Sequence, residues 1–330
     1  MGDLFLGFDT SNYTTSAAIF SGDTGDFILN YKKLLPVAEG ERGLRQSEAV
    51  FSHIKATGDA SEAIRAALGN TGDSSVIRAV ACSTAPRSAD GSYMPCFLVG
   101  EALASSVSAT LGVPLFKVSH QDGHVAAAVY SASRLYSFDA EGFLSRPFIS
   151  FHVSGGTFDV LKVSPSTAPE RRFAVSRIGG SLDASAGQII DRVGVIMGLR
   201  FPCGAEIDSL ALSFEGSPRK DGLSVHGTDC NMSGLENRSL RLLESGADRA
   251  EVSAYILNFI AEVVEKLTEN ATDPENLPVI YAGGVMSSSY IKNRLTDRGY
   301  FASPDLSSDN AAGVAFLARC LYLKNGGDAR

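Results

Sequence analysis

Two histidines four residues apart are the first residues whose types and spacing could do chemistry. His120 and His124 open an alanine-rich run that should be helical. Positions i and i+4 lie on one face of a helix, so two imidazoles there can share a divalent metal ion. The alternative is a hydrogen-bonded pair at an ordinary helix start, for which Ser119 is a suitable N-cap. Two ligands hold a metal poorly, and Asp309, ahead of the last predicted helix, is a carboxylate that could complete the set.

Three turns rich in glycine or hydroxyl groups follow apolar strands. Asp9, Thr10 and Ser11 end the first strand and begin a polar hairpin turn, where hydroxyls and backbone N–H groups could hold an anion. The second turn is Ser154-Gly155-Gly156-Thr157, and glycines allow a ligand to approach the backbone closely. The third, Gly283-Gly284, joins a strand to a helix, a junction suited to a phosphate. Ordinary polar or small-residue turns are the alternative at each position.

Asp191 is the acid that stands out in the second half of the chain. It lies in a run with helical spacing of apolar residues. Such an acid is ordinarily a solvated surface group, but not where its helix lines a cleft. A stiff turn, Phe201 to Ala205, then precedes another helix.

The elements that must position these residues alternate between strands and helices. Strands are predicted near residues 4–10, 15–20, 27–34, 76–83, 113–118, 148–153, 158–163 and 279–285. Residues 44–68 have a helical pattern that we interpret as two helices broken near Gly58. A hairpin with a polar turn begins each half of the chain, and this order predicts two related α/β domains.

Composition describes an ordinary folded protein. The 330 residues are 44% hydrophobic and 20% charged, and the formal net charge is −8, so charge alone does not predict a nucleic-acid partner. The five cysteines are odd in number and have no C-x-x-C spacing, a pattern typical of reduced thiols in the cytosol. No apolar stretch approaches the ~18 residues that span a membrane. We therefore expect a cytoplasmic protein with no membrane partner.

Six motifs in this order resemble the TsaD family of tRNA N6-adenosine threonylcarbamoyltransferases, once called O-sialoglycoprotein endopeptidases, over nearly the whole chain. They are Asp9-Thr10-Ser11, His120-x-x-x-His124, Val153-Ser154-Gly155-Gly156, Leu182-Asp183 with Ala186-Gly187 through Asp191, Ala282-Gly283-Gly284-Val285, and Ser308-Asp309-Asn310. The resemblance implies an α/β fold of the actin and sugar-kinase (ASKHA) type, with duplicated ribonuclease H-like domains and a cleft between them. We expect the first domain over residues 1–118, with part of the C-terminal helix, and the metal-site helix and second domain over 119–330.

The resemblance also implies ligands and roles. His120, His124 and Asp309 would bind one divalent metal, iron or zinc, while Asp9 and Ser11 would belong to the catalytic centre. The adenylate (threonylcarbamoyl-AMP, ATP or AMP) is assigned to Val153, Ser154, Gly155, Gly156, Asp191, Gly204, Gly283, Gly284 and Ser288. In the family the metal polarises the threonylcarbamoyl group, and a tRNA adenosine N6 amine attacks it and expels AMP. A metal with three protein ligands keeps open positions for such a role.

Four positions depart from the family pattern. Asn12-Tyr13-Thr14 stand where the family has Cys-Asp-Glu, so two acids are missing. Thr157 follows Gly156 without the usual histidine, and Ser288 stands where an asparagine is expected. Arg45-Gln46-Ser47 stand in place of an Arg-Asp-His element. The differences lie on the acceptor side and favour a divergent member.

The leading hypothesis is metal-dependent transfer of a threonylcarbamoyl group from threonylcarbamoyl-AMP to N6 of adenosine in tRNA. The alternatives are a carbamoyltransferase paralogue with a small-molecule or protein acceptor, and a non-catalytic scaffold of the tRNA-modifying complex. A scaffold has no need of the three metal ligands. Because phosphate contacts supply most RNA affinity, a chain of charge −8 should bind tRNA only with a partner subunit. A TsaB-like paralogue and a TsaE-like ATPase are the candidate partners.

Overall fold

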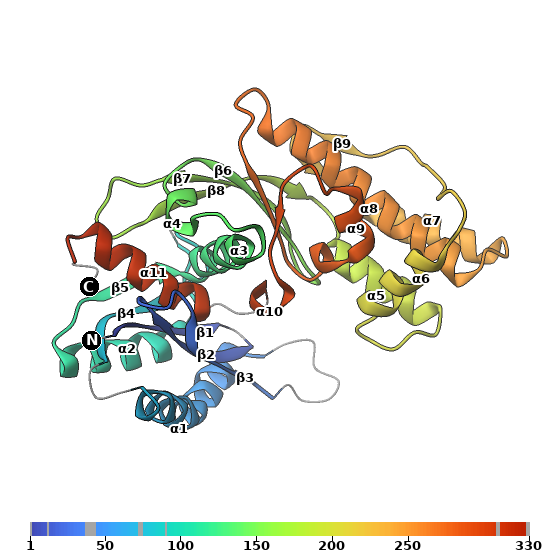
Figure 1. Cartoon of the computed structure of the whole chain (residues 1–330). Coiled ribbons are helices and arrows are strands. Elements are labelled where there is room, and N and C mark those ends of the chain that lie inside the picture. The colour runs from blue at the N-terminus through green and yellow to red at the C-terminus, as the bar shows by residue number, and fades with distance from the viewer. Residues whose placement is uncertain are drawn as a thin grey trace.

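The computed structural model describes residues 2–11, 13–36, 44–71, 75–89, 91–307 and 311–327. Its first sheet has five strands in the order β3-β2-β1-β4-β5 (Figure 1). The strands are β1 (Asp3–Ser11), β2 (Thr14–Ser21), β3 (Phe27–Leu34), β4 (Val76–Ala85) and β5 (Leu115–Ser119). The first three are antiparallel, and β4 and β5 run parallel to β1. Apolar side chains cover both faces of β1, as expected for a central strand between two helical layers.

The second sheet repeats this arrangement. Its seven strands have the order β12-β11-β6-β7-β8-β10-β9. They are β6 (Phe148–Val153), β7 (Phe158–Pro165), β8 (Phe173–Ser181), β9 (Val225–His226), β10 (Asp229–Cys230), β11 (Val279–Ala282) and β12 (Tyr300–Phe301). From β8 to β12 the order and the strand directions match those of the first sheet, with β9 and β10 added at one edge. The α/β fold therefore contains a duplicated unit.

Helices separate and cover the two sheets. α1 (Gln46–Gly69) and α2 (Phe97–Leu111) pack on the first sheet, whereas α3 (His120–Tyr136) and α11 (Ala311–Lys324) lie between the sheets (Figure 1). The remaining helices are α4 (Ala140–Phe143), α5 (Ala186–Ile196), α6 (Gly204–Ser213), α7 (Ser233–Glu244), α8 (Arg249–Thr272), the 3-10 helix η1 (Val285–Ser287), α9 (Ser289–Arg294) and α10 (Pro304–Ser307). None of the described helices is both long and apolar enough to cross a membrane.

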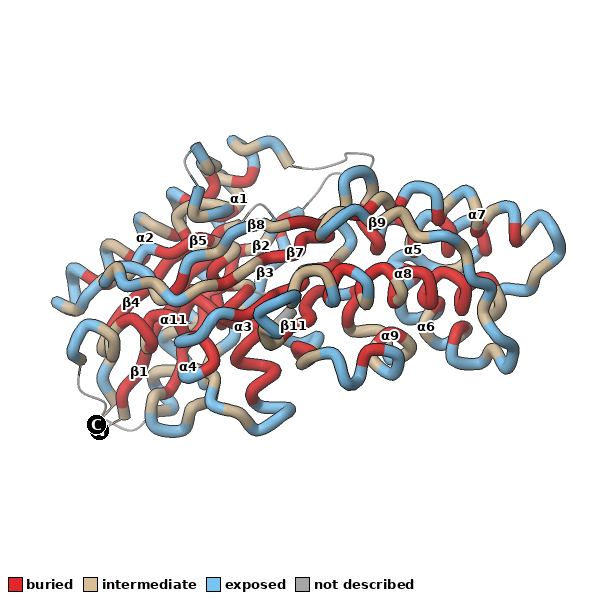
Figure 2. Tube along the Cα trace, turned by 90° about the horizontal axis from the view of Figure 1, so that it is seen from above, coloured by how far each residue is buried: buried red, intermediate tan, exposed pale blue. Residues whose placement is uncertain are grey.

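The central pair of helices shares one hydrophobic core with both sheets. Phe5 and Phe20 from the first sheet and Phe148 and Leu161 from the second belong to the same cluster as the buried faces of α3 and α11. Both helices are among the most continuously buried segments of the chain (Figure 2). Burial of this apolar surface holds the two sheets around α3, the helix that carries the histidine pair.

Glycines allow α11 to pack closely against its neighbours. A Cβ atom at Gly313 would lie 1.9 Å from the carbonyl oxygen of Gly123 in α3. A Cβ at Gly7 of β1 would lie 2.4 Å from the backbone nitrogen of Ala315. These distances are shorter than any real Cβ contact, so only glycine permits the observed positions of α11 between α3 and β1.

The predicted break near Gly58 is wrong, because α1 is one continuous helix from Gln46 to Gly69. Its buried residues Ala49, His53, Ala56 and Ala60 form a stripe with helical spacing that packs on the first sheet. Gly58 is exposed, and a Cβ there would meet no other atom. Burial of the stripe offsets the roughly 1 kcal/mol that a helical glycine costs.

These two glycines predict opposite effects of the same substitution. Gly313→Ala should lower the free energy of unfolding by about 2–3 kcal/mol, because backbone atoms must move to admit the methyl group. Gly58→Ala should raise it by about 0.5–1 kcal/mol, because the unfolded chain loses freedom at no steric cost. Urea denaturation measures both. Equal effects of the two changes would contradict the packing of α11 on α3.

Candidate active site

A capping box fixes the start of α3 and hence the first histidine. Ser119 Oγ accepts the N–H of Asp122 at 3.1 Å, and Asp122 Oδ2 accepts the N–H of Ser119 at 3.0 Å. Ser88 Oγ donates a further bond to the same carboxylate at 2.9 Å. The N-cap predicted at Ser119 is confirmed. Two reciprocal bonds leave little freedom in the first turn, which places His120 at the end of β5.

Asp9 orients His120. The carboxylate is fully buried at the end of β1, where Oδ1 accepts the N–H of Ser11 at 2.8 Å and Oδ2 accepts Ser83 Oγ at 3.0 Å. Asp9 Oδ2 also lies 2.7 Å from His120 Nδ1. An ionised carboxylate only accepts hydrogen bonds, so Nδ1 carries the proton and Nε2 is the ring nitrogen with a lone pair that could coordinate a metal. A carboxylate behind an imidazole is the usual arrangement around a metal-binding histidine.

Three imidazoles lie in a row beside Asp9. The ring centroids of His120 and His124 are 4.6 Å apart, and those of His124 and His152 are 4.9 Å apart. Burial lowers the pKa of His124 well below its ordinary value, and His120 and His152 lower it further. Burial also lowers the pKa of His152 to about 4, an effect that Asp159 opposes and His120 reinforces. Both rings are therefore neutral at pH 7, the form that binds metals.

These histidines line a cavity of ≈ 220 Å³, which we call the histidine pocket. Arg87, Thr157 and Asp159 also line it. In the part of the chain that the structure describes, no three His, Cys, Asp or Glu residues form a group that could hold a metal ion. The expected third ligand, Asp309, lies outside the described residues. The described part thus supplies two imidazoles on one helical face.

A larger cavity of ≈ 520 Å³, the glycine cavity, lies between α5, α6, α8 and the segment after β11. Gly155, Gly204 and Gly284 line it, and a Cβ at any of the three would meet no protein atom within 4 Å. None of them has a positive φ, so neither packing nor backbone conformation requires glycine. The missing side chains leave space for a ligand, and the volume suits a nucleotide.

The turn from Ser154 to Thr157 separates the two cavities. Gly155 faces the glycine cavity, whereas Thr157 lines the histidine pocket. The Ser154 N–H donates to Thr157 O at 2.8 Å, and the Thr157 N–H donates to Ser154 Oγ at 3.2 Å. Gly187 packs against this turn, since a Cβ there would lie 2.6 Å from Gly155 Cα. A ligand bound across the turn would reach both cavities.

The nine residues predicted to bind the adenylate divide into two groups. Five line the glycine cavity: Gly155, Asp191, Gly204, Gly284 and Ser288. Val153, Ser154, Gly156 and Gly283 are not among its lining residues. Gly283 has a φ of 100°, and a Cβ there would lie 2.2 Å from Val153 O. Gly283 therefore allows the end of β11 to lie close to β6. It affects the glycine cavity through the position of this strand and does not line the cavity itself.

Two carboxylates organise the cavity walls. Asp191 Oδ1 accepts the N–H of Cys203 at 2.8 Å and so ties α5 to the turn before α6. Asp208 Oδ1 accepts a bond from Ser288 Oγ, and its Oδ2 accepts the N–H of Ser289 at 2.9 Å. Ser288 in turn caps α9 by accepting the N–H of Ile291 at 3.2 Å. The sequence did not point to Asp208, because its partners lie about eighty residues away.

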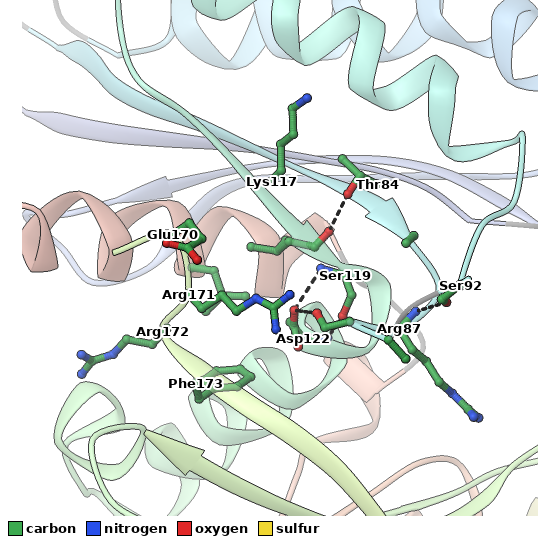
Figure 3. A pocket seen from close by; sticks show the side chains of 15 residues that line it. Thr84, Arg87, Ser92, Lys117, Ser119, Asp122, Glu170, Arg171, Arg172 and Phe173 are labelled. Carbon is green, nitrogen blue, oxygen red and sulfur yellow. Dashed lines mark hydrogen bonds between the residues drawn. The ribbon is translucent and has the colours of Figure 1, made fainter. Parts of the chain in front are cut away.

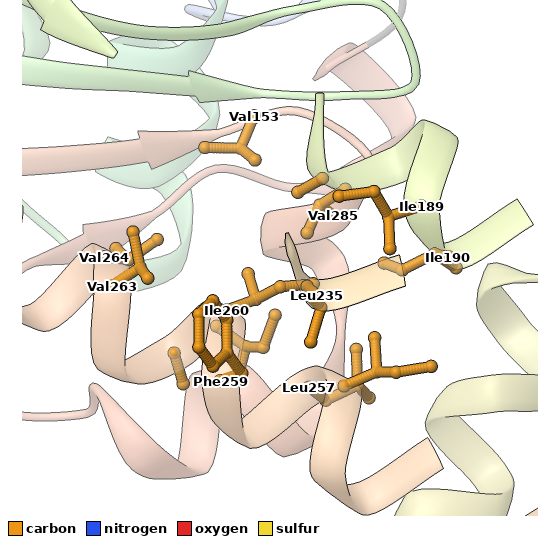
Figure 4. Packing of buried hydrophobic residues seen from close by; sticks show 14 of the residues in the cluster. Val153, Ile189, Ile190, Leu235, Leu257, Phe259, Ile260, Val263, Val264 and Val285 are labelled. Carbon is orange, nitrogen blue, oxygen red and sulfur yellow. The ribbon is translucent and has the colours of Figure 1, made fainter. Parts of the chain in front are cut away.

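The hydrophobic cluster behind the cavity makes these walls rigid. Val153 from β6, Ile189 and Ile190 from α5, and Leu257 and Ile260 from α8 belong to one buried group (Figure 4). All five are less than 5% exposed. Close packing of branched side chains restricts movement of the elements that carry the glycines.

A third cavity of ≈ 230 Å³, the arginine pocket, lies beside the first turn of α3 (Figure 3). Arg87, Lys117, Asp122 and Arg171 are among its lining residues. The side chain of Arg171 extends toward Asp122, whereas that of Arg87 points away from both (Figure 3). Lys324 Nζ holds the backbone beneath Arg171 by donating to three carbonyl oxygens at 2.6–2.7 Å.

Sequence reasoning missed two histidines. His152 on β6 lines the histidine pocket, and the available signal was that two polar residues, Ser150 and His152, alternate with apolar residues in this strand. His53 is buried on α1, with Nδ1 2.7 Å from Thr15 Oγ1 in the first hairpin. The segment Arg45-Gln46-Ser47, which stands in place of the family's Arg-Asp-His element, lies at the start of the same helix. Asn12 is outside the described residues, and Tyr13 beside it is 45% exposed.

Comparison with known proteins identifies the family. The model of the family tRNA N6-adenosine threonylcarbamoyltransferase, TsaD, matches residues 53–316. The chain belongs to the TsaD family. It is 31% identical to the tRNA N6-adenosine threonylcarbamoyltransferase of Moorella thermoacetica, over 69% of this chain and 67% of that protein. It is 29% identical to the protein of the same name from Caulobacter vibrioides, over 94% and 85% of the two chains. TsaD family membership makes this chain a transferase.

Solved structures show the same fold. The structure of HypF from T. kodakarensis has a TM-score of 0.56 and 13% identity, covering 98% of this chain and 48% of that chain. Full-length HypF in its phosphate- and nucleotide-bound form has a TM-score of 0.55 and 11% identity, covering 99% and 47%. At these identities the likeness concerns the fold alone, and it confirms the predicted ASKHA class.

The buried imidazoles predict a proton titration that NMR can follow in metal-free protein. The ring protons of His152 should titrate with a midpoint near pH 4, and those of His124 should titrate well below the ordinary value for histidine. His120→Gln should raise both midpoints by removing a neighbouring positive charge, and Asp159→Asn should lower that of His152. Stability from these groups is complete above about pH 6.5 and is lost as pH falls toward 4. Midpoints near 6.5 would contradict the burial of the two rings.

Proposed function

We propose that the chain transfers a threonylcarbamoyl group from threonylcarbamoyl-AMP to N6 of adenosine in tRNA. One observation carries the proposal: the Ser154–Thr157 turn forms a wall of both the glycine cavity and the histidine pocket. An acyl-adenylate has a nucleotide part and a reactive acyl part joined at one phosphate. A site with a nucleotide-sized cavity on one side of a glycine turn and imidazoles on the other matches that shape.

The glycine cavity would bind the AMP part. Gly155 and Gly284 leave room for the ligand beside backbone atoms, and Asp191 and Ser288 supply polar groups at the wall. The Ser154–Thr157 turn, held by its own hydrogen bonds, would bind the phosphate, and the acyl carbon would then face the histidine pocket. Preorganised binding of this kind brings the reacting groups together without further ordering of the protein.

The metal proposal rests on the chemistry of the donor set. His120 and His124 lie on one face of α3, both rings have a neutral nitrogen to offer, and Asp9 fixes the tautomer of His120. These groups fit iron or zinc, and we propose Asp309 as the third ligand. When bound, the metal would act as a Lewis acid on the acyl group. Asp9 would act through His120 by keeping the proton on Nδ1, and Ser11 would support Asp9 through its N–H.

The acceptor side is where a second candidate function arises. Tyr13 and Thr14 occupy the hairpin tip in place of two acids, and Thr157 occupies the position after the two glycines. These changes favour, as the second candidate, a carbamoyltransferase with another acceptor. For tRNA itself, we propose that a partner subunit supplies the basic surface that a chain of charge −8 lacks.

Two neighbouring aspartates provide a matched test of the metal site. The purified chain should hold about one iron or zinc ion, and Asp309→Asn should lose most of it, because two imidazoles alone bind such metals weakly. Asp305→Asn changes an exposed acid on α10 and should keep the ion. Elemental analysis of the three proteins measures this. Equal metal content in all three would remove Asp309 from the ligand set.

The transfer reaction itself can be tested with bicarbonate, threonine, ATP, the adenylate-forming enzyme and total tRNA. Nucleoside mass spectrometry should show threonylcarbamoyl adenosine, with partner subunits added if the chain alone is inactive. Gly155→Val should fold, since a Cβ at this position meets no protein atom within 4 Å, but should lose AMP binding and at least about tenfold of the activity. Gly222→Val, equally open but outside the cavity, is the control. Full activity in Gly155→Val would place the adenylate elsewhere, and no product in any mixture would contradict the function.

A further inference from the structure

Arg87 is a cation fixed at the edge of the histidine pocket. Its loop is tied to α3, because Pro86 O accepts the N–H of Gln121 at 3.0 Å. The Arg87 N–H also donates to Ser92 Oγ at 3.0 Å. Arg87 follows Pro86 and His120 precedes Gln121, so this bond keeps the backbone of Arg87 close to that of His120. Among the described residues that line the histidine pocket, Arg87 is the one lysine or arginine.

The side chain of Arg87 shares one carboxylate with a second arginine. The Asp159 side chain belongs to a residue that is only 6% exposed. Its Oδ1 accepts a hydrogen bond from Arg177 Nε at 2.7 Å, and its Oδ2 accepts one from Arg87 Nη2 at 3.2 Å. Two guanidinium groups around one carboxylate leave a net positive charge at the pocket. Arg177 makes the shorter contact, so Asp159 would keep an arginine partner if Arg87 bound another anion.

Arg87 has N–H donors beyond the one that contacts Asp159. A guanidinium has five N–H donors, and among the described residues Arg87 gives one of them to Asp159. Its side chain is 52% exposed, so a ligand can reach it. Figure 3 shows its side chain directed away from Arg171 and Asp122. Arg87 lines both the arginine pocket and the histidine pocket, so its remaining donors are within reach of a ligand in the histidine pocket.

We propose that Arg87 binds the carboxylate of the acyl group and so selects an acyl-adenylate that carries a carboxylate over one with a bare carbamoyl group. This inference rests on the proposed function and names the part of the substrate that one residue recognises. Arginine pairs with carboxylates through parallel N–H bonds that are both strong and directional. Asp159 competes with the substrate for Arg87 and holds the guanidinium in place before binding.

Two non-hydrolysable AMP analogues test the proposal, one with the threonine carboxylate and one with a carboxamide in its place. Calorimetry should show that the wild-type chain binds the carboxylate analogue about tenfold or more tightly, as for a charge-assisted hydrogen bond. Arg87→Gln should reduce this ratio to near one, with AMP affinity unchanged. Asp159→Asn should maintain or increase the ratio, because it releases Arg87 from a competing carboxylate. Arg171→Gln, in the arginine pocket, is the control and should leave the ratio unchanged.

The outcomes separate this inference from the function on which it rests. If wild type binds both analogues equally, or Arg87→Gln keeps the preference, Arg87 does not read the carboxylate, while AMP binding leaves the proposed function intact. If Asp159→Asn weakens the preference as much as Arg87→Gln, the pair is a structural bridge and the inference is wrong. A wild-type chain that binds neither AMP nor either analogue contradicts the proposed function and the inference with it.

Discussion

Close contact between α3 and α11 is the constraint on which the site depends. The two helices fill the space between the sheets, and Gly313 approaches the Gly123 carbonyl so closely that no side chain fits between them. This packing fixes α3 against β1 through α11. The histidines of α3 thus stand beside Asp9 of the first sheet and His152 of the second. A site built from both halves of a duplicated fold needs such a fixed central layer.

The chemistry is divided between the two sides of one turn. On one side, glycines without packing neighbours leave a cavity in which a nucleotide fits. On the other, burial keeps two imidazoles neutral, and a buried carboxylate orients a third. Neutral imidazoles favour a metal, whereas Arg87 places a positive charge at the edge of the same pocket. These environments lie close together yet separate, because the Ser154–Thr157 turn is held by its own hydrogen bonds.

Much of the fold and part of the site could be predicted from local sequence signals. The sequence predicted eight of the twelve described strands and missed β8, β9, β10 and β12. The predicted strands, the N-cap at Ser119, the spacing of His120 and His124, and the glycine turns depend on residues near one another in the chain. Gly58 led to the wrong prediction of a break in α1. The free energy that a glycine costs inside a helix is small compared with the free energy gained by burying the apolar stripe of α1.

Other features depend on distant partners. The ion pair of Arg87 with Asp159 joins residues 72 positions apart, and the bond from Ser288 to Asp208 spans 80. Gly283 was assigned to the adenylate and Gly187 only to a motif, but the structure shows that each admits a backbone from another strand or turn. No local pattern distinguishes a glycine needed for packing from one that leaves room for a ligand. Gly155 and Gly283 were separable only after their neighbours were known.

The most direct test of the account is a crystal structure of the chain with iron or zinc and a non-hydrolysable threonylcarbamoyl-AMP analogue. The account predicts an anomalous peak beside His120 and His124, adenine in the glycine cavity beside the segment after β11, the phosphate at Gly155, and the acyl group in the histidine pocket. A nucleotide bound in the arginine pocket, or a metal away from the two histidines, would contradict it.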